Sequence, residues 1–206
     1  MVNLIPGKVD VLPSRILKKY FSIPNSNFVR YGVSDDGTCF FHSIAAAMNL
    51  SNYHHRSLQT KKKIGRNLRR ILQRTMNLDT WKEFWEARGI SIKKVPNVRS
   101  VIKKMKNPSQ WSDIFMIIYV MDSLGLNMIF FDSKTNSMYC GVRGKGDAKN
   151  TVFILWVNRA HFEPIFSIQK DNKVTTIFKK GNPIVGHVMN MYSKSSCPDV
   201  TLNSVL

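Results

Sequence analysis

The chain has 206 residues, of which 43% are hydrophobic and 21% are charged, so length and composition favour one folded domain with short extensions over a disordered protein. Its formal net charge of +18 arises from 31 lysines and arginines against 13 aspartates and glutamates. Such an excess indicates an acidic partner, an anionic surface or simply solubility at high positive charge, and charge alone does not choose among the three.

The cysteines argue against a disulfide framework or a zinc site. Cys39, Cys140 and Cys197 are far apart and form no CxxC pair, as expected in a reducing compartment. The N-terminus lacks the order of a secretory signal, and the longest strongly apolar run, Ile114 to Met121, is too short to span a bilayer. We therefore expect an intracellular, cytoplasmic monomer that uses no metal, no cofactor and no membrane.

The first part of the chain is expected to be an extended strap followed by helices. Residues 1–13 contain two prolines and a glycine, which disfavour a helix. Ser14 is expected to cap a short helix over Arg15–Tyr20. Phe28–Val33 then leads into an acidic turn, and an apolar helix is expected from about Cys39 to Leu50.

Beyond the polar segment Asn52–Arg56, apolar residues recur at helical spacing through a sequence rich in lysine and arginine. The pattern predicts a helix with one buried face and one strongly basic face. The apolar stripe consists of Leu58, Ile64, Leu68, Ile71 and Leu72.

Three more helices are predicted. Asp79 or Thr80 is expected to cap the first, with Glu83 completing a capping box for Thr80. A weaker helix is expected over Val98–Lys106, and the clearest core helix is expected over Trp111–Leu124.

After Leu124 the pattern changes to period two and to short apolar runs, which are typical of strands. Helices followed by a mainly antiparallel sheet predict an α+β fold in which helices flank the sheet. Residues 181–206 carry little pattern and are expected to form a surface strap or a tail. The predicted strands are Asn127–Phe131, Met138–Val142, Thr151–Val157, Phe162–Ile168 and Lys173–Phe178, the last pairing with the one before it.

The candidate nucleophile lies in the segment from Ser34 to Ser43. There, an acidic, glycine-containing turn places Cys39 at the start of an apolar helix. Unpaired backbone N–H groups and the positive end of the helix dipole favour a thiolate there. A nucleophilic cysteine needs a base. His161, after an apolar strand, is the candidate, and His42 on the same helix as Cys39 is the local competitor.

The segment Asp36-Gly37-Thr38-Cys39 and the later block Ala160-His161-Phe162-Glu163-Pro164 resemble the OTU (ovarian tumour) family of cysteine peptidases, whose members act as deubiquitinases. The resemblance covers roughly Val29 to Phe166, in the right order. It implies a papain-related fold with a catalytic domain over residues 29–180. Residues 1–28 would then be a strap with a short helix, and 181–206 a C-terminal extension. The compact size and divergent flanks resemble a viral member, which would act in the host-cell cytoplasm.

In such an enzyme Cys39 would attack the C-terminus of ubiquitin, or of a ubiquitin-like modifier, and form a thioester. His161 would be its base. Glu163, two residues further along the strand and so on the same face, would orient His161. The family often has Asp or Asn at that position, which leaves the orienting role open between Glu163 and Asp36.

The resemblance also implies roles for residues around the reacting atoms. Asp36 would hold the turn so that the amides of Gly37, Thr38 and Cys39 point at the developing oxyanion. Trp156 and Phe162 would form aromatic walls of a narrow channel that admits the Gly-Gly tail of ubiquitin, the expected partner alone or in chains.

Other interpretations stay open. A cysteine on an apolar helix is more often part of an inert core, Glu163 could be a surface charge, and Trp156 and Phe162 could be ordinary core aromatics. The alternative function is a basic nucleic-acid- or ubiquitin-binding protein on the same scaffold with little or no catalysis. It is motivated by the basic helix after Leu58 and by the net charge.

Overall fold

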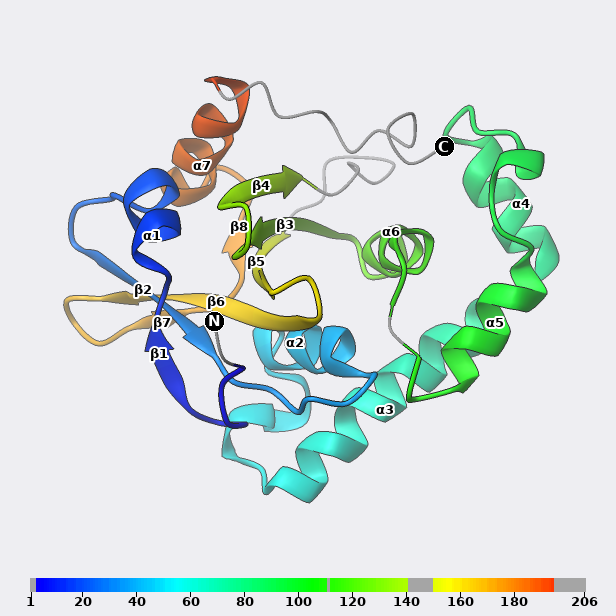
Figure 1. Ribbon diagram of the computed structural model, residues 1–206, viewed down its shortest axis with the longest axis horizontal. Helices are drawn as coiled ribbons and strands as arrows, with labels where there is room; N and C mark the ends of the chain where they lie inside the picture. The colour runs from blue at the N-terminus through cyan, green and yellow to red at the C-terminus, as the bar shows by residue number, and fades with distance from the viewer. Residues whose placement is uncertain (1–2, 111, 141–149, 195–206) are drawn as a thin grey trace.

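The computed structural model describes residues 3–110, 112–140 and 150–194. In this part of the chain an eight-stranded sheet lies between helices (Figure 1). The strands are β1 (Val9–Val11), β2 (Ser26–Tyr31), β3 (Leu126–Asp132), β4 (Ser137–Cys140), β5 (Asn150–Val157), β6 (His161–Gln169), β7 (Val174–Thr175) and β8 (Phe178–Lys179).

The sheet has the order β1-β2-β6-β5-β3-β4, with β7 beside β6 and β8 beside β5. Among the described strands, β3 and β5 pair in parallel and the other pairs are antiparallel. The expected α+β fold with a mainly antiparallel sheet is therefore confirmed. The helices are α1 (Ser14–Tyr20), α2 (Cys39–Ala47), α3 (Leu58–Thr75), α4 (Leu78–Glu86), α5 (Val98–Lys106), α6 (Ile114–Ser123), α7 (Pro183–Lys194) and the 3-10 helices η1 (Leu50–His55) and η2 (Ile92–Lys94).

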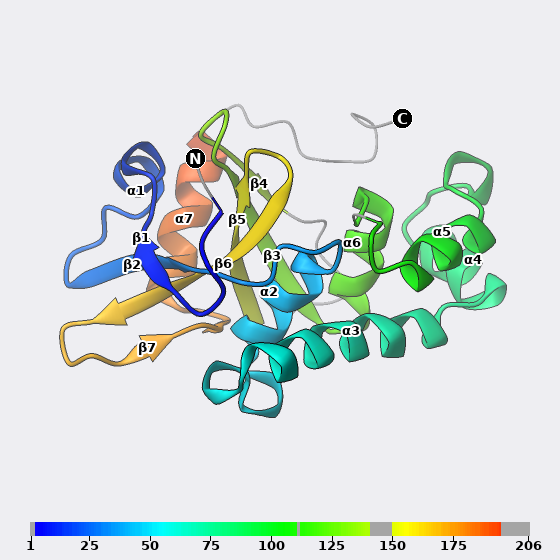
Figure 2. The same cartoon turned by 60° about the horizontal axis from the view of Figure 1, so that its bottom comes forward.

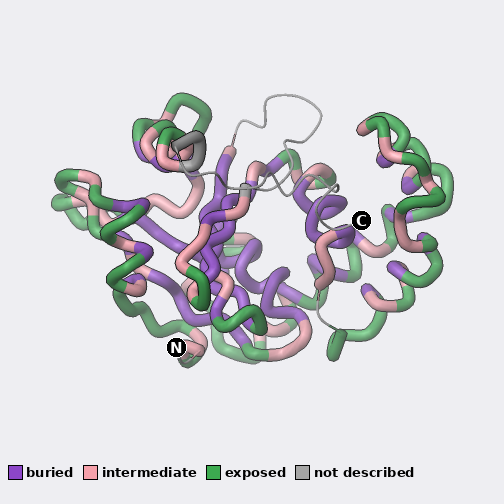
Figure 3. Tube along the Cα trace, turned by 45° about the horizontal axis from the view of Figure 1, so that its top comes forward, coloured by how far each residue is buried: buried purple, intermediate pink, exposed green. Residues whose placement is uncertain are grey.

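Side-chain alternation along the strands builds a separate core on each face of the sheet. In β3, Met128 and Phe130 join the core formed with α2 and α6, whereas Ile129 and Phe131 join the core formed with α1 and α7. Figure 2 shows α2 in front of the sheet, with α3 outside it, and α7 behind. Because both faces are covered, the central strands are buried on both sides (Figure 3).

Helix α2 is buried over its whole length, from Cys39 to Ala47, because it lies between β6 and α3. The hydroxyl of Ser43 donates a hydrogen bond of 2.8 Å to the carbonyl oxygen of Phe162 in β6. Asn49, with φ of 47°, then turns the chain into η1, so the helix ends before the predicted Leu50. The N-terminus of α2 is thereby held against the start of β6.

The basic helix α3 is confirmed, and its buried face overlaps the predicted stripe, because Leu68 and Leu72 are buried and Ile64 packs against the core. Leu58 and Ile71 are 46% and 57% exposed, whereas Gly65 and Arg69 are buried. Gly65 packs against the ring of His42 in α2, and the close approach of the two helices rotates the contact face toward it.

The start of α4 corrects the predicted cap. The side chain of Asn77, not of Asp79 or Thr80, accepts the first hydrogen bond, from the Thr80 N–H at 3.0 Å. The Thr80 hydroxyl in turn accepts from the Asn77 N–H at 3.0 Å, so Thr80 closes the capping box and Glu83 takes no part in it.

Two other helices begin differently from the prediction. Ser14 is the first residue of α1 and makes no side-chain cap bond. Helix α6 begins at Ile114, where the Asp113 carboxylate accepts a hydrogen bond of 3.0 Å from the Met116 N–H. The expectation that the helix opens at Trp111 falls on a residue outside the described part of the chain.

The C-terminal part of the chain has more structure than predicted. The expected strand over 173–178 is two short strands, of which β7 pairs with β6 and β8 with β5. The patternless segment contains α7, with Pro183 at its first position and Asn182 accepting from the Ile184 N–H at 2.9 Å. The end of the strand predicted over 138–142 and residues 195–206 lie outside the described residues. Within the described residues, no helix combines the length and apolarity needed to cross a bilayer.

The contact between α2 and α3 depends on the missing side chain at Gly65. A Cβ there would overlap the fully buried ring of His42. We expect Gly65→Ala to lower the free energy of unfolding by about 1–3 kcal/mol, measured by urea denaturation.

Gly186→Ala in α7 is the matched control, because a Cβ at that position meets nothing within 4 Å. We expect it to raise the free energy of unfolding by about 0.5–1 kcal/mol. Equal effects of the two substitutions would contradict this account of the α2–α3 contact.

Candidate active site

The acidic turn before α2 is organised around Asp36. Its side chain accepts a hydrogen bond of 2.9 Å from the Thr38 N–H, and its carbonyl oxygen accepts one of 2.9 Å from the Cys39 N–H. The same carboxylate lies 3.4 Å from Nε2 of His42 and 3.5 Å from Arg66. Burial raises the pKa of Asp36, but the bonds from His42 and Thr38 and the charge of Arg66 outweigh it and hold that pKa below its usual value.

Gly37 is required by a close approach of two chain segments. A Cβ at this residue would overlap the backbone of Pro108 and Ser109. Its carbonyl oxygen accepts a hydrogen bond of 2.6 Å from the guanidinium of Arg69. In the described part of the chain the Gly37 N–H has no acceptor, whereas the Thr38 N–H is already bound by Asp36.

Arg69 is the buried cation that holds this turn. It is 2% exposed, lies over the ring of Phe41 and donates to carbonyl oxygens at the end of α5 and in the following loop. These bonds tie the loop after α5 to the turn before α2. The further acceptors are the carbonyl oxygens of Lys104, Met105, Asn107 and Gln110, at 2.7 to 2.9 Å.

Cys39 is the first residue of α2 and is 1% exposed. Burial raises the pKa of its thiol to about 12, and the negative charges of Asp35 and Asp36 add to the rise. Hydrogen bonding with the backbone of Phe162 and Phe40 acts in the opposite direction. The resting thiol is therefore protonated at neutral pH.

His161 opens β6 and is fully buried between two carboxylates. Its Nδ1 lies 3.4 Å from Oδ1 of Asp35, and its Nε2 lies 3.8 Å from Oε1 of Glu163. Burial lowers the pKa of the imidazole, which Asp35 and Asp36 oppose and His42 reinforces. Neither ring nitrogen makes a hydrogen bond to a described residue.

Glu163 is a buried carboxylate and not a surface charge. It accepts a hydrogen bond of 2.7 Å from the backbone N–H of Leu4 and one of 3.2 Å from Arg30 in β2. Burial raises the pKa of Glu163, although the bond from Leu4 and the charge of Arg30 act against the rise. Arg30 also reaches Asp10 at 3.0 Å.

The structure brings the two predicted segments together. Cys39 lies against the backbone of Phe162, the residue that follows His161 along β6. No hydrogen bond between Cys39 and His161 is found among the described residues, and the carboxylate of Asp35 faces the imidazole nitrogen distal to Glu163. The described residues thus hold a buried thiol against the residue that follows the buried imidazole, with no hydrogen bond between the two groups.

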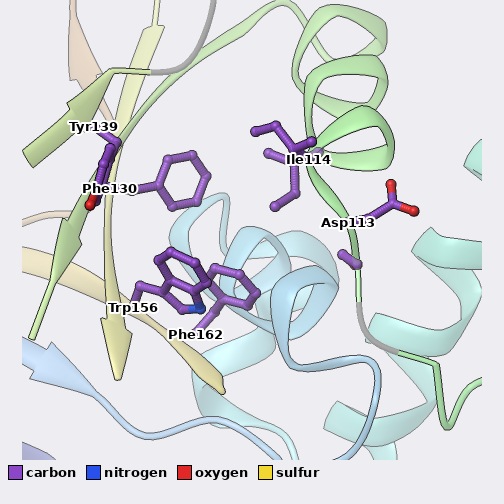
Figure 4. A pocket seen from close by; sticks show the side chains of 8 residues that line it. Asp113, Ile114, Phe130, Tyr139, Trp156 and Phe162 are labelled. Carbon is purple, nitrogen blue, oxygen red and sulfur yellow. The ribbon is translucent and has the colours of Figure 1, made fainter. Parts of the chain in front are cut away.

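An apolar cavity of about 400 Å³ opens beside this site. Trp156 and Phe162 stack at its floor, with ring centroids 6.0 Å apart and planes 4° from parallel (Figure 4). Phe130 and Tyr139 face Ile114 across it (Figure 4). The remaining lining residues are Ser112, Asp113 and Ile117.

Four residues at the site were not assigned these roles from the sequence: Asp35 facing His161, Arg30 on Glu163, Arg69 on the turn, and His42 against Asp36. The first two had a detectable signal. Asp35 is one of two consecutive acids before a glycine, and Arg30 is the single charge in the run Phe28–Val33. Among the described residues, no group of three or more His, Cys, Asp and Glu side chains could hold a metal ion.

Comparison with known proteins identifies the fold. No protein-family description and no curated protein matches the sequence. A solved OTU domain in complex with ubiquitin is similar over 93% of both chains, with a TM-score of 0.58 and 18% identity. The OTU domain of OTUD1 is similar over 73% of this chain and 92% of that one, with a TM-score of 0.51 and 15% identity. The chain therefore has the fold of the OTU (ovarian tumour) domains.

Proposed function

We propose that the chain is a cysteine-type deubiquitinase, an isopeptidase that cleaves the bond between the C-terminus of ubiquitin, or of a ubiquitin-like modifier, and a lysine. The observation that carries the proposal is the position of Cys39, at the N-terminus of a buried helix and against the strand that His161 opens. The OTU domain solved with ubiquitin, which has the same fold, supports the choice of substrate.

Each step of the reaction uses a group at this site. His161 takes the proton of the Cys39 thiol, and the sulfur attacks the carbonyl carbon at the C-terminus of ubiquitin. The tetrahedral intermediate expels the lysine amine, which takes the proton from His161, and leaves a thioester. Water, deprotonated by His161, then attacks the thioester and releases the ubiquitin carboxylate and the thiol.

The Gly37 N–H is the amide best placed to bind the oxyanion, because it has no acceptor among the described residues. Asp36 and Arg69 act as positioning residues, since they hold the peptide groups on either side of Gly37. The Thr38 N–H can contribute only if it leaves Asp36.

The side chains around His161 must rearrange before catalysis. The pKa of Cys39 is raised and that of His161 is lowered, so both groups are neutral at pH 7. The exposed carboxylate of Asp35 faces the Nδ1 of His161. Substrate binding would displace Asp35 and let this nitrogen meet the sulfur, while Glu163 holds the opposite nitrogen.

The cavity beside Phe162 is assigned to the substrate. Its stacked Trp156 and Phe162 would form the wall along which the C-terminal tail of ubiquitin reaches Cys39. Cytoplasmic location, a monomeric state and viral origin stay predictions.

A ubiquitin probe with a C-terminal electrophile tests the proposal. We expect the wild type to form one covalent adduct and Cys39→Ala to form none, since the sulfur is the nucleophile. Intact-mass spectrometry measures the adduct, and circular dichroism checks that the variant is folded. A folded wild type that stays unlabelled would argue against the proposed function.

The protonation state of the resting thiol is measured by its alkylation with iodoacetamide. With Cys140 and Cys197 replaced by serine, the rate at Cys39 should rise roughly tenfold per pH unit from pH 7 to pH 9, because the thiolate fraction rises in this way below a pKa of about 12. Cys39→Ser in the same background gives the blank. A rate that levels off near pH 7 would show that the thiolate is already formed.

Arg30→Gln tests the buried ion pair with Glu163. A carboxylate whose folded-state pKa is raised contributes less stability as pH rises from its unfolded pKa of about 4.3 through the folded value. Loss of Arg30 raises that pKa further. The variant should therefore lose about 3–5 kcal/mol of unfolding free energy at pH 7 and less at pH 5, measured in urea.

Asp10→Asn is the control for this substitution, because it removes the exposed partner of Arg30 and leaves Glu163 paired. We expect it to cost at most about 1 kcal/mol. A loss for Arg30→Gln that is small or that does not change with pH would contradict the assigned pairing.

A further inference from the structure

Helices α3 and α5 each carry one row of exposed positive charges. The residues of each row follow at intervals of three or four, so they share a face of their helix. Neither helix contains an acidic residue. The rows are Lys63, Arg66, Arg70 and Arg74 on α3 and Arg99, Lys103 and Lys106 on α5.

These charges are largely unneutralised within the described chain. Arg66 lies 3.5 Å from Asp36, and among the described residues no carboxylate lies within 4.0 Å of the other six side chains. Like charges four residues apart, such as Arg66 with Arg70 and Arg70 with Arg74, destabilise a helix by about 0.2–0.5 kcal/mol per pair. A bound polyanion would remove this repulsion.

The two rows meet at a cavity of about 270 Å³ between α3 and α5. Arg69 forms the inner wall, because its hydrogen bonds to the carbonyl oxygens of Lys104, Met105 and Asn107 attach the end of α5 to α3. Charged groups at the mouth come from both helices. The lining residues are Arg66, Arg69, Arg70, Gln73, Met105, Lys106 and Pro108.

A phosphate is the anion that this cavity suits. Guanidinium groups bind phosphate oxygens through paired N–H donors, and the mouth offers Arg66 and Arg70 with the ammonium of Lys106 opposite. The rows extend along both helices beyond the cavity, further than one small anion could reach. Uniformly positive surfaces of this kind are characteristic of interfaces with nucleic acid, whereas interfaces between proteins are less positively charged.

We propose that the cavity between α3 and α5 binds a phosphate of a nucleic-acid backbone, with the two rows binding the adjacent phosphates. Neither helix contains an aromatic residue on which a base could stack, so binding depends on the backbone and not on base sequence. The cavity shares Arg66 and Arg69 with the proposed active site, where they contact Asp36 and Gly37. Both residues are therefore left unchanged in the test.

The experiment is a fluorescence-anisotropy titration of the full chain with a labelled single-stranded RNA of mixed sequence, at 50 to 200 mM NaCl. With about five phosphates bound, the logarithm of the association constant should fall with the logarithm of salt concentration with a slope of about −3.5. Arg70→Ala with Lys106→Ala should weaken binding about tenfold or more at the lowest salt. The slope should become shallower by about 1.4, because two phosphate contacts are lost.

Lys18→Ala with Lys173→Ala is the matched control, since it removes the same charge from exposed positions away from α3 and α5. It should change affinity less than threefold. An equal loss in the two double variants would overturn the site, because binding would then follow net charge alone.

Competition of two unlabelled anions with the labelled RNA identifies the anion that the site binds. An unlabelled RNA of unrelated sequence should displace the labelled strand at a similar concentration, and pyrophosphate should displace it only at far higher concentration, since it fills the cavity and not the rows. Displacement by polyglutamate as effective as by RNA would overturn the proposal in favour of an acidic protein segment. Tight binding of pyrophosphate with no binding of RNA would overturn the backbone assignment.

Discussion

The docking of α2 on β6 is the contact on which the site depends. The hydroxyl of Ser43 binds the carbonyl oxygen of Phe162, and the sulfur of Cys39 lies against the backbone of the same residue. Two points of α2 one helical turn apart are thereby attached to one residue of the strand. Since His161 precedes Phe162, any shift of the helix along β6 would change the distance from thiol to imidazole directly.

The site contains a buried carboxylate whose charge must be balanced by other groups. Glu163 is enclosed, and its carboxylate is balanced by Arg30 and by the backbone N–H of Leu4, from the segment that precedes β1. Removing a partner from a buried ion leaves the full cost of desolvation behind. The N-terminal segment is therefore part of the site, and not only an entry strap, because one of its amides satisfies the carboxylate beside His161.

The sheet and the main helices could be predicted because the spacing of apolar residues and the composition are properties of short segments of sequence. The local pattern marks Asp35 as an acid of the turn, but its place opposite His161 depends on where the strand that begins at His161 meets that turn. Leu68 and Leu72 of the predicted stripe are buried in α3. Leu58 and Ile71 are exposed, because the contact face of the helix is turned toward Gly65, which packs against His42. The last helix was missed because its apolar positions are diluted by glycine, asparagine and histidine.

The central claim is that Cys39 and His161 come together when a substrate displaces Asp35. A crystal structure of the covalent adduct between Cys39 and a ubiquitin C-terminal electrophile measures this directly, through the separation of the sulfur and the imidazole Nδ1. The account predicts that the two atoms lie within hydrogen-bond reach and that Asp35 has turned away. An adduct in which Asp35 still faces Nδ1 and the sulfur lies out of reach of the ring would contradict it.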